Sequence, residues 1–407
     1  MLVHWLWLAT RPNLPDRQKK RLLEVFEDAE EIYWAKKEDF LSVEGLSVEE
    51  MNSLLNKDLT QAEEILNQCI DKDIHICTYS DREYPHRLKH IFDPPMVLYY
   101  KGNLPDMNHA PVLAAVGTRR ASAYGMQVAR RMGYQIVSCG GILVSGMAKG
   151  NDAMAMEGAL LAGGTVLGVL GCGVDVIYPV ANRSLFADVE RCGCLISEFP
   201  PETPPYRWNF PRRNRIMSGL SNGTVVIEAP EGSGALITAR EALEQGRDVY
   251  AVPGTADMSG FAGSNALLRE GATLVRDGWD VVGEYQHLYP NAVHPMTVQM
   301  PAEVCAVTPE KVAQKPILPK AKPTFDKKKE KKPIDKTDNQ PYSDVIERLN
   351  RLPENQRQIA ELLTHERLVD EIIEETGLPA SKVSATLTLM EIKGVIRRLP
   401  GNRVALK

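Results

Sequence analysis

Between residues 112 and 254 the chain alternates short apolar runs with longer amphipathic stretches. Short runs without a polar face are typical of parallel strands that are buried on both sides. The stretches between them are long enough for helices, and glycine clusters follow the first strands. We therefore predict an α/β fold with a doubly wound parallel sheet. The expected strands are residues 112–116, 142–144, 165–170, 195–197, 224–227 and 249–252.

The segment from Phe210 to Gly254 shows this alternation most clearly. It begins with a basic cluster at an expected helix start and continues through the strand at 224–227. A glycine-rich turn, Glu231–Gly234, then opens directly into a helix that Gly246 ends. Strand, turn, helix and strand form a βαβ unit, whose turn lies at the carboxyl edge of the sheet. Free N–H groups and the positive end of the helix favour a phosphate ligand there.

The rest of the chain divides into further segments around a core expected over residues 76–285. Residues 1–75 carry apolar positions at helical spacing and predict a small helical domain. Its turn at 40–47 suits either a phosphate-binding hairpin between helices or a plain tight turn, and the glutamates around it favour the plain turn. Residues 286–340 are rich in Pro and Lys and predict a solvated linker.

Residues 341–407 show the helix, turn, helix and hairpin pattern of a winged helix. The first of these helices is expected at 368–375 and is strongly acidic, while the second, 382–393, offers Lys382 and otherwise mainly Ser and Thr. This pattern leaves duplex binding and protein docking open for the module.

The composition limits the kinds of site that this chain can carry. It has 407 residues and a formal net charge of -5, so a nucleic-acid site must come from local clusters of Lys and Arg. The seven cysteines form no C-x-x-C pair, which indicates reduced thiols in a cytoplasmic protein without a metal. No apolar run is long enough to span a bilayer, and Leu2–Ala9 lacks the flanks of a signal peptide. No motif predicts a cofactor.

Three glycine turns are candidate phosphate sites. Glycine lets a phosphate approach the backbone, while hydroxyl and cationic side chains bind its oxygens. Because the strands end at one edge of the sheet, the three turns should lie side by side and suit the successive phosphates of a single strand. The candidates are Gly117, Thr118, Arg119 and Arg120 in the first turn, Gly146, Lys149 and Gly150 in the second, and Ser233 and Gly234 in the third.

Aromatic residues alternate with arginines between Tyr206 and Arg215. Unpaired bases stack on aromatic rings while guanidinium groups hold the backbone, and each stacked base contributes ~1–3 kcal/mol. Trp208 suits a core position as well as a base contact. Pro211 and the charged neighbours favour a base contact for Phe210. The candidates in this segment are Arg207, Phe210, Arg212, Arg213 and Asn214.

The runs FPRRNRI-x-x-GLS, SG-x-LITA and GRDVYAVPG, followed by Gly263-Ser264-Asn265, resemble the DNA-processing protein A family, also called DprA or Smf. The resemblance extends over nearly the whole chain. It implies a Rossmann-like core between a helical domain and a winged helix, and a homodimer formed through that core. It also implies a recombination mediator that binds single-stranded DNA, protects it and loads a RecA-type recombinase in natural transformation.

The resemblance also implies roles for individual residues. In that family the G-[ST]-R motif, and a basic and an aromatic residue just before the RNR run, contact single-stranded DNA. These positions correspond to Arg119, Arg207 and Phe210 in this sequence. The chain departs from the family pattern at Asn151, where isoleucine is usual, and at Val180, where lysine is common.

An enzyme that processes nucleotides, similar to a phosphoribohydrolase, is the alternative function. The chain has no Walker A run, no G-x-G-x-x-G and no HExxH. Glu198 and Glu228 follow strands and would be the acid or base of such an enzyme. We expect instead that they cap helices or pair with Arg213 and Arg215, and that the chain is not an enzyme. A purely structural docking protein would leave the arginine-aromatic segment unexplained.

Overall fold

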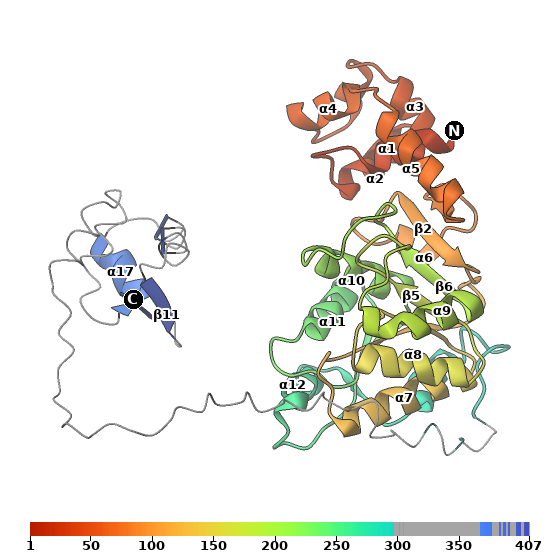
Figure 1. Cartoon of the computed structure of the whole chain (residues 1–407), viewed down its shortest axis with the longest axis vertical. Helices are drawn as coiled ribbons and strands as arrows, with labels where there is room; N and C mark the ends of the chain where they lie inside the picture. Colours follow the sequence, from red (N-terminus) through yellow and green to blue (C-terminus); the bar gives the residue numbers. More distant parts are fainter. Residues whose placement is uncertain are drawn as a thin grey trace, which may run out of the picture. The chain divides into compact units, whose positions relative to one another are not determined.

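The computed structural model describes residues 1–296, 301 and 304, and, nearer the C-terminus, 367–376, 382, 383, 386, 387, 390, 396–399 and 403–406 (Figure 1). The chain divides into two compact units, residues 1–317 and 318–407, which are described separately. Most of the linker expected over 286–340 lies outside the described residues.

The first unit contains a nine-stranded sheet in the order β1-β2-β6-β5-β4-β3-β7-β8-β9. The neighbours from β6 to β9 are parallel, while β1 and β2 pair antiparallel along one side. The strands are β1 (His75–Thr78), β2 (Val97–Gly102), β3 (Val112–Val116), β4 (Ile142–Ser145), β5 (Val166–Val169), β6 (Cys194–Ser197), β7 (Gly223–Val226), β8 (Asp248–Ala251) and β9 (Thr273–Leu274). The predicted doubly wound sheet is therefore confirmed, and the six predicted strands lie within one residue of their expected bounds.

Helices cover both faces of this sheet (Figure 1). One face carries α7 (Ala123–Ser138), α8 (Asn151–Leu161), α9 (Arg183–Cys192) and α13 (Gly278–Val282), and the other carries α6 (His86–Lys89), α10 (Asn209–Leu220), α11 (Gly234–Glu244) and α12 (Ala262–Arg269). Short 3₁₀ turns are η1 (Asp39–Ser42), η2 (Val180–Asn182), η3 (Ser259–Phe261) and η4 (Gly283–Tyr285).

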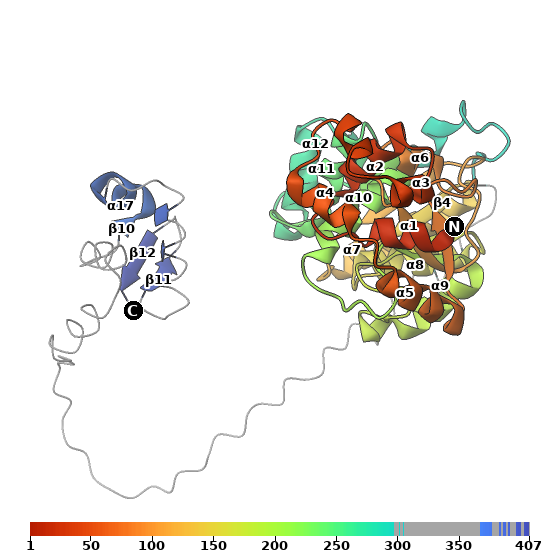
Figure 2. The same ribbon diagram turned by 90° about the horizontal axis from the view of Figure 1, so that it is seen from above.

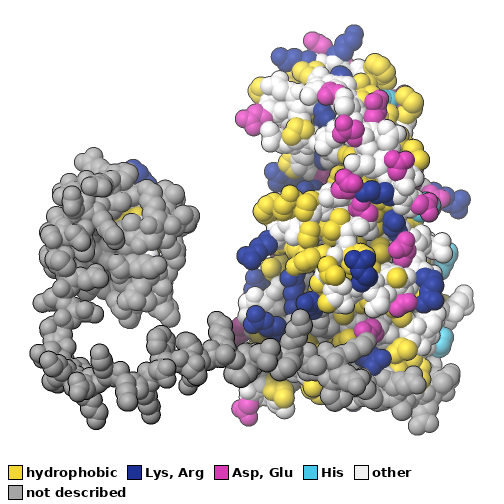
Figure 3. All heavy atoms as spheres, viewed as in Figure 1, with side chains coloured by type: hydrophobic (Ala, Val, Ile, Leu, Met, Phe, Trp, Pro, Cys, Tyr) yellow, Lys and Arg dark blue, Asp and Glu magenta, His cyan; other side chains and the backbone are white. Residues whose placement is uncertain are grey.

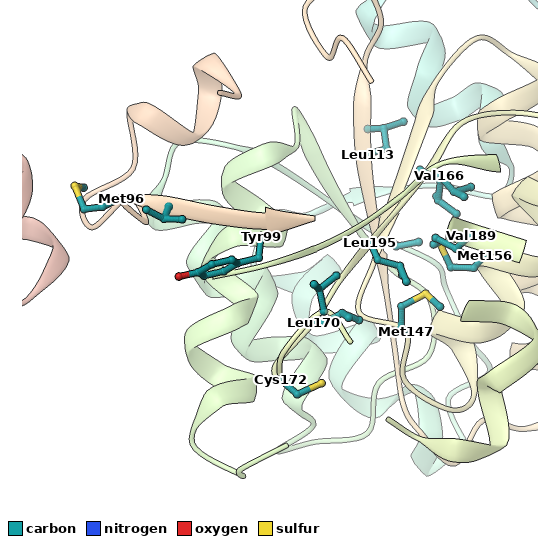
Figure 4. Close-up of a cluster of buried hydrophobic side chains, with 14 of the residues drawn as sticks. Met96, Tyr99, Leu113, Met147, Met156, Val166, Leu170, Cys172, Val189 and Leu195 are labelled. Atoms are coloured by element: carbon teal, nitrogen blue, oxygen red, sulfur yellow. The ribbon is translucent and has the colours of Figure 1, made fainter. Parts of the chain in front are cut away.

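The alternation of side chains along each strand supplies both layers of the core. In β3, Leu113 belongs to the hydrophobic cluster on the α7–α8 side, whereas Val112 belongs to the cluster on the α10–α11 side. Figure 4 shows part of the first cluster, in which Met156 of α8 and Val189 of α9 gather close to Leu195 of β6. Because all residues of β3 to β7 are buried, ligands can approach these strands only at their ends.

The N-terminal helices form the small helical domain that the sequence predicts (Figure 2). They are α1 (Leu2–Ala9), α2 (Asp16–Val25), α3 (Ala29–Trp34), α4 (Val48–Leu55) and α5 (Thr60–Asp71). At the turn over 40–47, Ser47 and Glu50 form a capping box that occupies two backbone N–H groups at the start of α4. The carbonyl of Gly45 accepts a hydrogen bond from Gln18. These contacts favour the plain tight turn, because the amides of Ser47 and Glu50 are already bonded within the protein.

A buried cluster of charges joins α2 to the sheet. Asp16 lies 3.0 Å from Lys19 and 3.2 Å from Arg215, and Arg215 lies 2.6 Å from Glu198. Burial alone would raise the pKa of Asp16, but the neighbouring Lys19, Arg215 and Arg212 hold that pKa below its usual value. Burial raises the pKa of Glu198, and the same two arginines offset it only in part.

The second unit contains a three-stranded antiparallel sheet in the order β10-β12-β11. Its described elements are β10 (Arg367–Leu368), α17 (Val369–Thr376), β11 (Ile396–Leu399) and β12 (Arg403–Leu406). They confirm the predicted first helix and the terminal hairpin. Most of the helix expected over 382–393 lies outside the described residues.

Replacing Asp16 by alanine should strongly destabilise the first unit. The variant leaves the buried ammonium of Lys19 without its carboxylate and removes one partner of Arg215. Breaking a buried pair in this way costs about 3–5 kcal/mol, to be measured as the change in free energy of unfolding in urea. The control is Asp188→Ala, which removes the partner of the exposed Arg191 and should cost less than about 1 kcal/mol. Equal losses in the two variants would contradict this account.

Candidate nucleic-acid interface

The candidate site lies where the order of the strands reverses. From β3 the chain continues through β4, β5 and β6 on one side, and then returns to place β7 on the other side of β3. β3 and β7 are therefore neighbours, and the chain leaves their carboxyl ends toward opposite sides of the sheet. In open parallel sheets this topological switch point forms the crevice in which ligands bind.

A groove of about 420 Å³ occupies this position, between the turn after β3, the turn after β7 and the start of α10. The predicted residues that line it are Gly117, Thr118, Arg119, Arg120, Phe210, Arg213, Asn214, Ser233 and Gly234. Two of the three predicted phosphate turns and the start of the arginine-aromatic helix thus come together at one edge of the sheet.

A second hollow of about 400 Å³ adjoins this groove and shares Arg119 and Phe210 with it. The rest of its wall consists of Gly146, Ala148, Lys149 and the loop Tyr178–Ala181. The guanidinium carbon of Arg119 lies 5.1 Å from the centre of the Phe210 ring, and the Tyr178 ring lies 5.6 Å from the same ring. This cation-π pair lies between a groove lined by two glycine turns and a hollow lined mainly by apolar side chains.

Backbone and amide hydrogen bonds fix the turn after β3. The N–H of Thr118 donates to the carbonyl of Glu228 at 2.7 Å, and Nδ2 of Asn151 donates to the same oxygen at 3.3 Å. Gly117 and Gly150 must be glycines, because a Cβ at either position would overlap Asn151 or the backbone of Thr118. Asn151, the first residue of α8, thus helps to hold the turn in place.

The second predicted turn is occupied by protein at its first glycine. Arg213 is only 4% exposed, and its guanidinium donates to the carbonyl of Val169 and covers the side of Gly146 where a side chain would be. Burial lowers the pKa of Arg213 to about 10, and the nearby Asp152 offsets part of this shift. Gly146 therefore makes room for Arg213. Lys149 of the same turn is exposed and faces the second hollow.

The third predicted turn is open. Ser233 caps α11, and its Oγ accepts a hydrogen bond from the N–H of Ala235. Gly232 has a φ of 71°, in the left-handed region, and a Cβ placed on it or on Gly234 would meet nothing within 4 Å. A phosphate oxygen can therefore approach this turn directly. Gly232 was not among the predicted site residues, although its place in the glycine-rich turn is a signal for it.

The arginine-aromatic segment divides between two sides of α10. Phe210, Arg213 and Asn214 face the groove, as the helical spacing i, i+3, i+4 requires. Arg212 instead pairs with Asp16 at 2.9 Å. Arg215 also pairs with Asp16, in the buried charge cluster that joins α2 to the sheet.

The residues just before α10 are exposed. Arg207 is exposed, and Trp208 is 70% exposed, so a core position for Trp208 is wrong. Figure 3 shows Lys and Arg side chains on the side of the sheet unit that carries α10 to α12.

The two strand-end glutamates hold protein groups, as expected. Both oxygens of Glu228 accept from the N–H of Ser122, the residue that caps α7. Glu198 pairs with Arg215 at 2.6 Å. Arg213, which was expected to pair with one of these glutamates, donates instead to the carbonyl of Val169.

Among the described residues there is no cluster of His, Cys, Asp and Glu that could hold a metal ion, and no helix there has the length and apolarity needed to cross a membrane.

Known proteins similar to this chain agree with this architecture. The family model for DNA recombination-mediator protein A matches residues 75–286, and that for the DprA winged helix domain matches residues 347–402. Protein Smf of Synechocystis sp. is 32% identical over 407 residues, which cover 98% of this chain and 97% of that protein. DNA processing protein DprA of Bacillus subtilis is 41% identical over 214 residues, 53% of this chain and 72% of that protein.

The X-ray structure of DNA processing protein A from Streptococcus pneumoniae matches with a TM-score of 0.62 at 32% identity, covering 70% of this chain and 98% of that one. The family model matches more than half of the chain, and the cyanobacterial relative is matched along nearly its whole length. This chain therefore belongs to the DNA recombination-mediator protein A (DprA/Smf) family.

Proposed function

We propose that this protein binds single-stranded DNA along the groove at the carboxyl edge of its sheet. The observation that carries the proposal is the contact between Arg119 and Phe210, which lies between the groove and the adjoining hollow. A phosphate on the open turn at Gly232–Gly234 and on Arg119 would place the attached base against the Phe210 ring. Lys149 and Arg207 would hold neighbouring phosphates, since both are exposed.

The chemistry of the site favours an unpaired strand over a duplex. A ring can stack on Phe210 only if the base is free of its partner, because the faces of paired bases are covered by their neighbours. The turn after β3 is already fixed by hydrogen bonds before any ligand arrives, so binding costs little backbone ordering there. Thr118, Arg120 and Asn214 complete the polar lining, while Arg213 supports the floor.

We propose further that binding, rather than bond cleavage, is the activity. Glu198 and Glu228 are engaged by Arg215 and Ser122, which supports a structural role for the two carboxylates nearest to strand ends. Membership of the family supports a cytoplasmic recombination mediator that shields single-stranded DNA from nucleases and loads a RecA-type recombinase. It also supports a homodimer through the sheet domain.

Replacing Phe210 by alanine should weaken the binding of a labelled oligothymidylate by roughly 5- to 150-fold, the effect of losing one stacked base. Arg119→Ala should weaken it as well, because this variant removes both a phosphate contact and the cation that lies against the ring. Fluorescence anisotropy at one fixed salt concentration measures both. The matched control is Arg191→Ala, an exposed arginine on α9 just before β6 and so toward the amino edge of the sheet. Unchanged affinity in both groove variants would overturn the proposed site.

The salt dependence of binding should separate the two residues. For single strands the slope of log K against log salt is about −0.7 for each phosphate that is neutralised. Arg119→Ala should therefore make the slope shallower by about 0.7, whereas Phe210→Ala should lower the affinity and leave the slope as it is. The same slope change in both variants would contradict the division between phosphate and base contacts.

An assay of nucleotide turnover should separate the mediator from the enzyme. The purified full chain should protect a single-stranded oligonucleotide from an exonuclease and release no free base from nucleoside monophosphates, as followed by chromatography. Glu228→Gln should leave protection intact as long as the variant folds. The alternative function would be established if the unchanged protein turned over monophosphates, Glu228→Gln abolished that turnover, and neither protein protected oligonucleotides.

A further inference from the structure

We infer that Tyr206 and Trp208 form a second base-stacking platform, which extends the path of single-stranded DNA beyond the groove. The inference rests on the proposed function, since it adds a site to the same strand. Neither residue lines the groove or the adjoining hollow. The platform would therefore receive a base that the groove itself does not hold.

The two rings are assembled into a stack at the surface. Their centroids lie 4.7 Å apart and their planes differ by 10°. Tyr206 is 45% exposed and Trp208 is 70% exposed, so the stack leaves most of the indole open to solvent. A base that stacks on the indole would find a ring already held in position, which lowers the entropic cost of binding.

The platform is attached firmly to the groove. Asn209, which is buried, donates its backbone N–H to the carbonyl of Tyr206 at 3.1 Å and is the first residue of α10. Phe210 follows directly, and two residues of chain span at most about 7 Å. A base on Trp208 and a base on Phe210 can therefore belong to neighbouring parts of one strand.

The surroundings suit a nucleic acid better than a protein partner. Arg207 lies between the two rings in sequence, is exposed, and makes no hydrogen bond or ion pair with any residue that the structure describes. It is thus available for a phosphate beside a stacked base. The two rings together expose on the order of 250 Å². A specific protein interface needs about 800 Å² from each partner, so this pair alone is too small for one.

The test compares oligothymidylates of about 4 and about 16 nucleotides, lengths that span the range of known single-strand sites. In the full-length protein, Trp208→Ala should weaken binding of the longer oligonucleotide by roughly 5- to 150-fold and leave binding of the shorter one unchanged. Trp208→Phe should retain most of the affinity because it keeps a ring. The matched control is Trp34→Ala, which removes a tryptophan of 68% exposure on α3 and should change neither affinity.

Intrinsic fluorescence gives a second measurement. Addition of the longer oligonucleotide should quench the emission of the unchanged protein more than that of the Trp208→Phe variant, and the difference is the signal of Trp208. Quenching without this difference would overturn the inference.

The outcomes distinguish the platform from the groove. If Arg119→Ala abolishes binding of both lengths while Trp208→Ala affects neither, the groove stands and the platform is wrong. If Trp208→Ala weakens both lengths equally, Trp208 acts within the groove or on its folding, and a separate platform is also wrong. If neither variant changes binding of either length, the proposed function itself fails. Retained DNA binding in Trp208→Ala together with lost binding of a RecA-type recombinase would assign the rings to a protein partner instead.

Discussion

The burial of two guanidinium groups on helix α10 is the constraint on which the rest of the site depends. A buried charge costs several kcal/mol unless neighbouring groups compensate it, so each arginine fixes the side of the helix that carries it. Arg213 reaches the carbonyl of Val169 at the end of β5. Arg215, two residues on, reaches Glu198 and Asp16 on another side. With both anchored, α10 cannot rotate, and Phe210 is held against Arg119.

This arrangement makes the N-terminal domain part of the site without bringing it into the groove. Asp16 contributes a carboxylate from α2 to the charge cluster. Burial lowers the pKa of Arg215, but Glu198, Asp93 and Asp16 together raise that pKa above its usual value. The small helical domain thus supplies part of the negative charge that lets a core helix carry a buried arginine. Asp16 itself does not line the groove, so in the proposed site its role is to position α10.

Sequence patterns located most of the sheet but not the charges that orient α10. Apolar runs such as 112–116 are visible because both faces of each strand are buried, whereas β9 has two residues and leaves no run to detect. Helical spacing is enough to predict that Phe210 and Arg213 lie on a different side of α10 from Arg212. Arg212 pairs with Glu198 and with Asp16, and no local pattern connects Arg212 to Asp16, which lies 196 residues earlier. Trp208 stayed ambiguous because its exposure depends on how the preceding turn places it on Tyr206.

If the site binds DNA as proposed, its two kinds of contact predict little preference for the sequence of the bases. The faces of Phe210 and, as inferred, of Trp208 are apolar surfaces that every base can use. The groups that would bind phosphates are the glycine turns and cations such as Arg119, and the phosphates are the part of the strand that does not vary. Discrimination between bases requires directed hydrogen bonds to their edges. The described loop at the adjoining hollow, Tyr178–Ala181, offers mainly apolar side chains there. A surface of this kind would contact the backbone and accept any base, as the proposed role of a mediator requires.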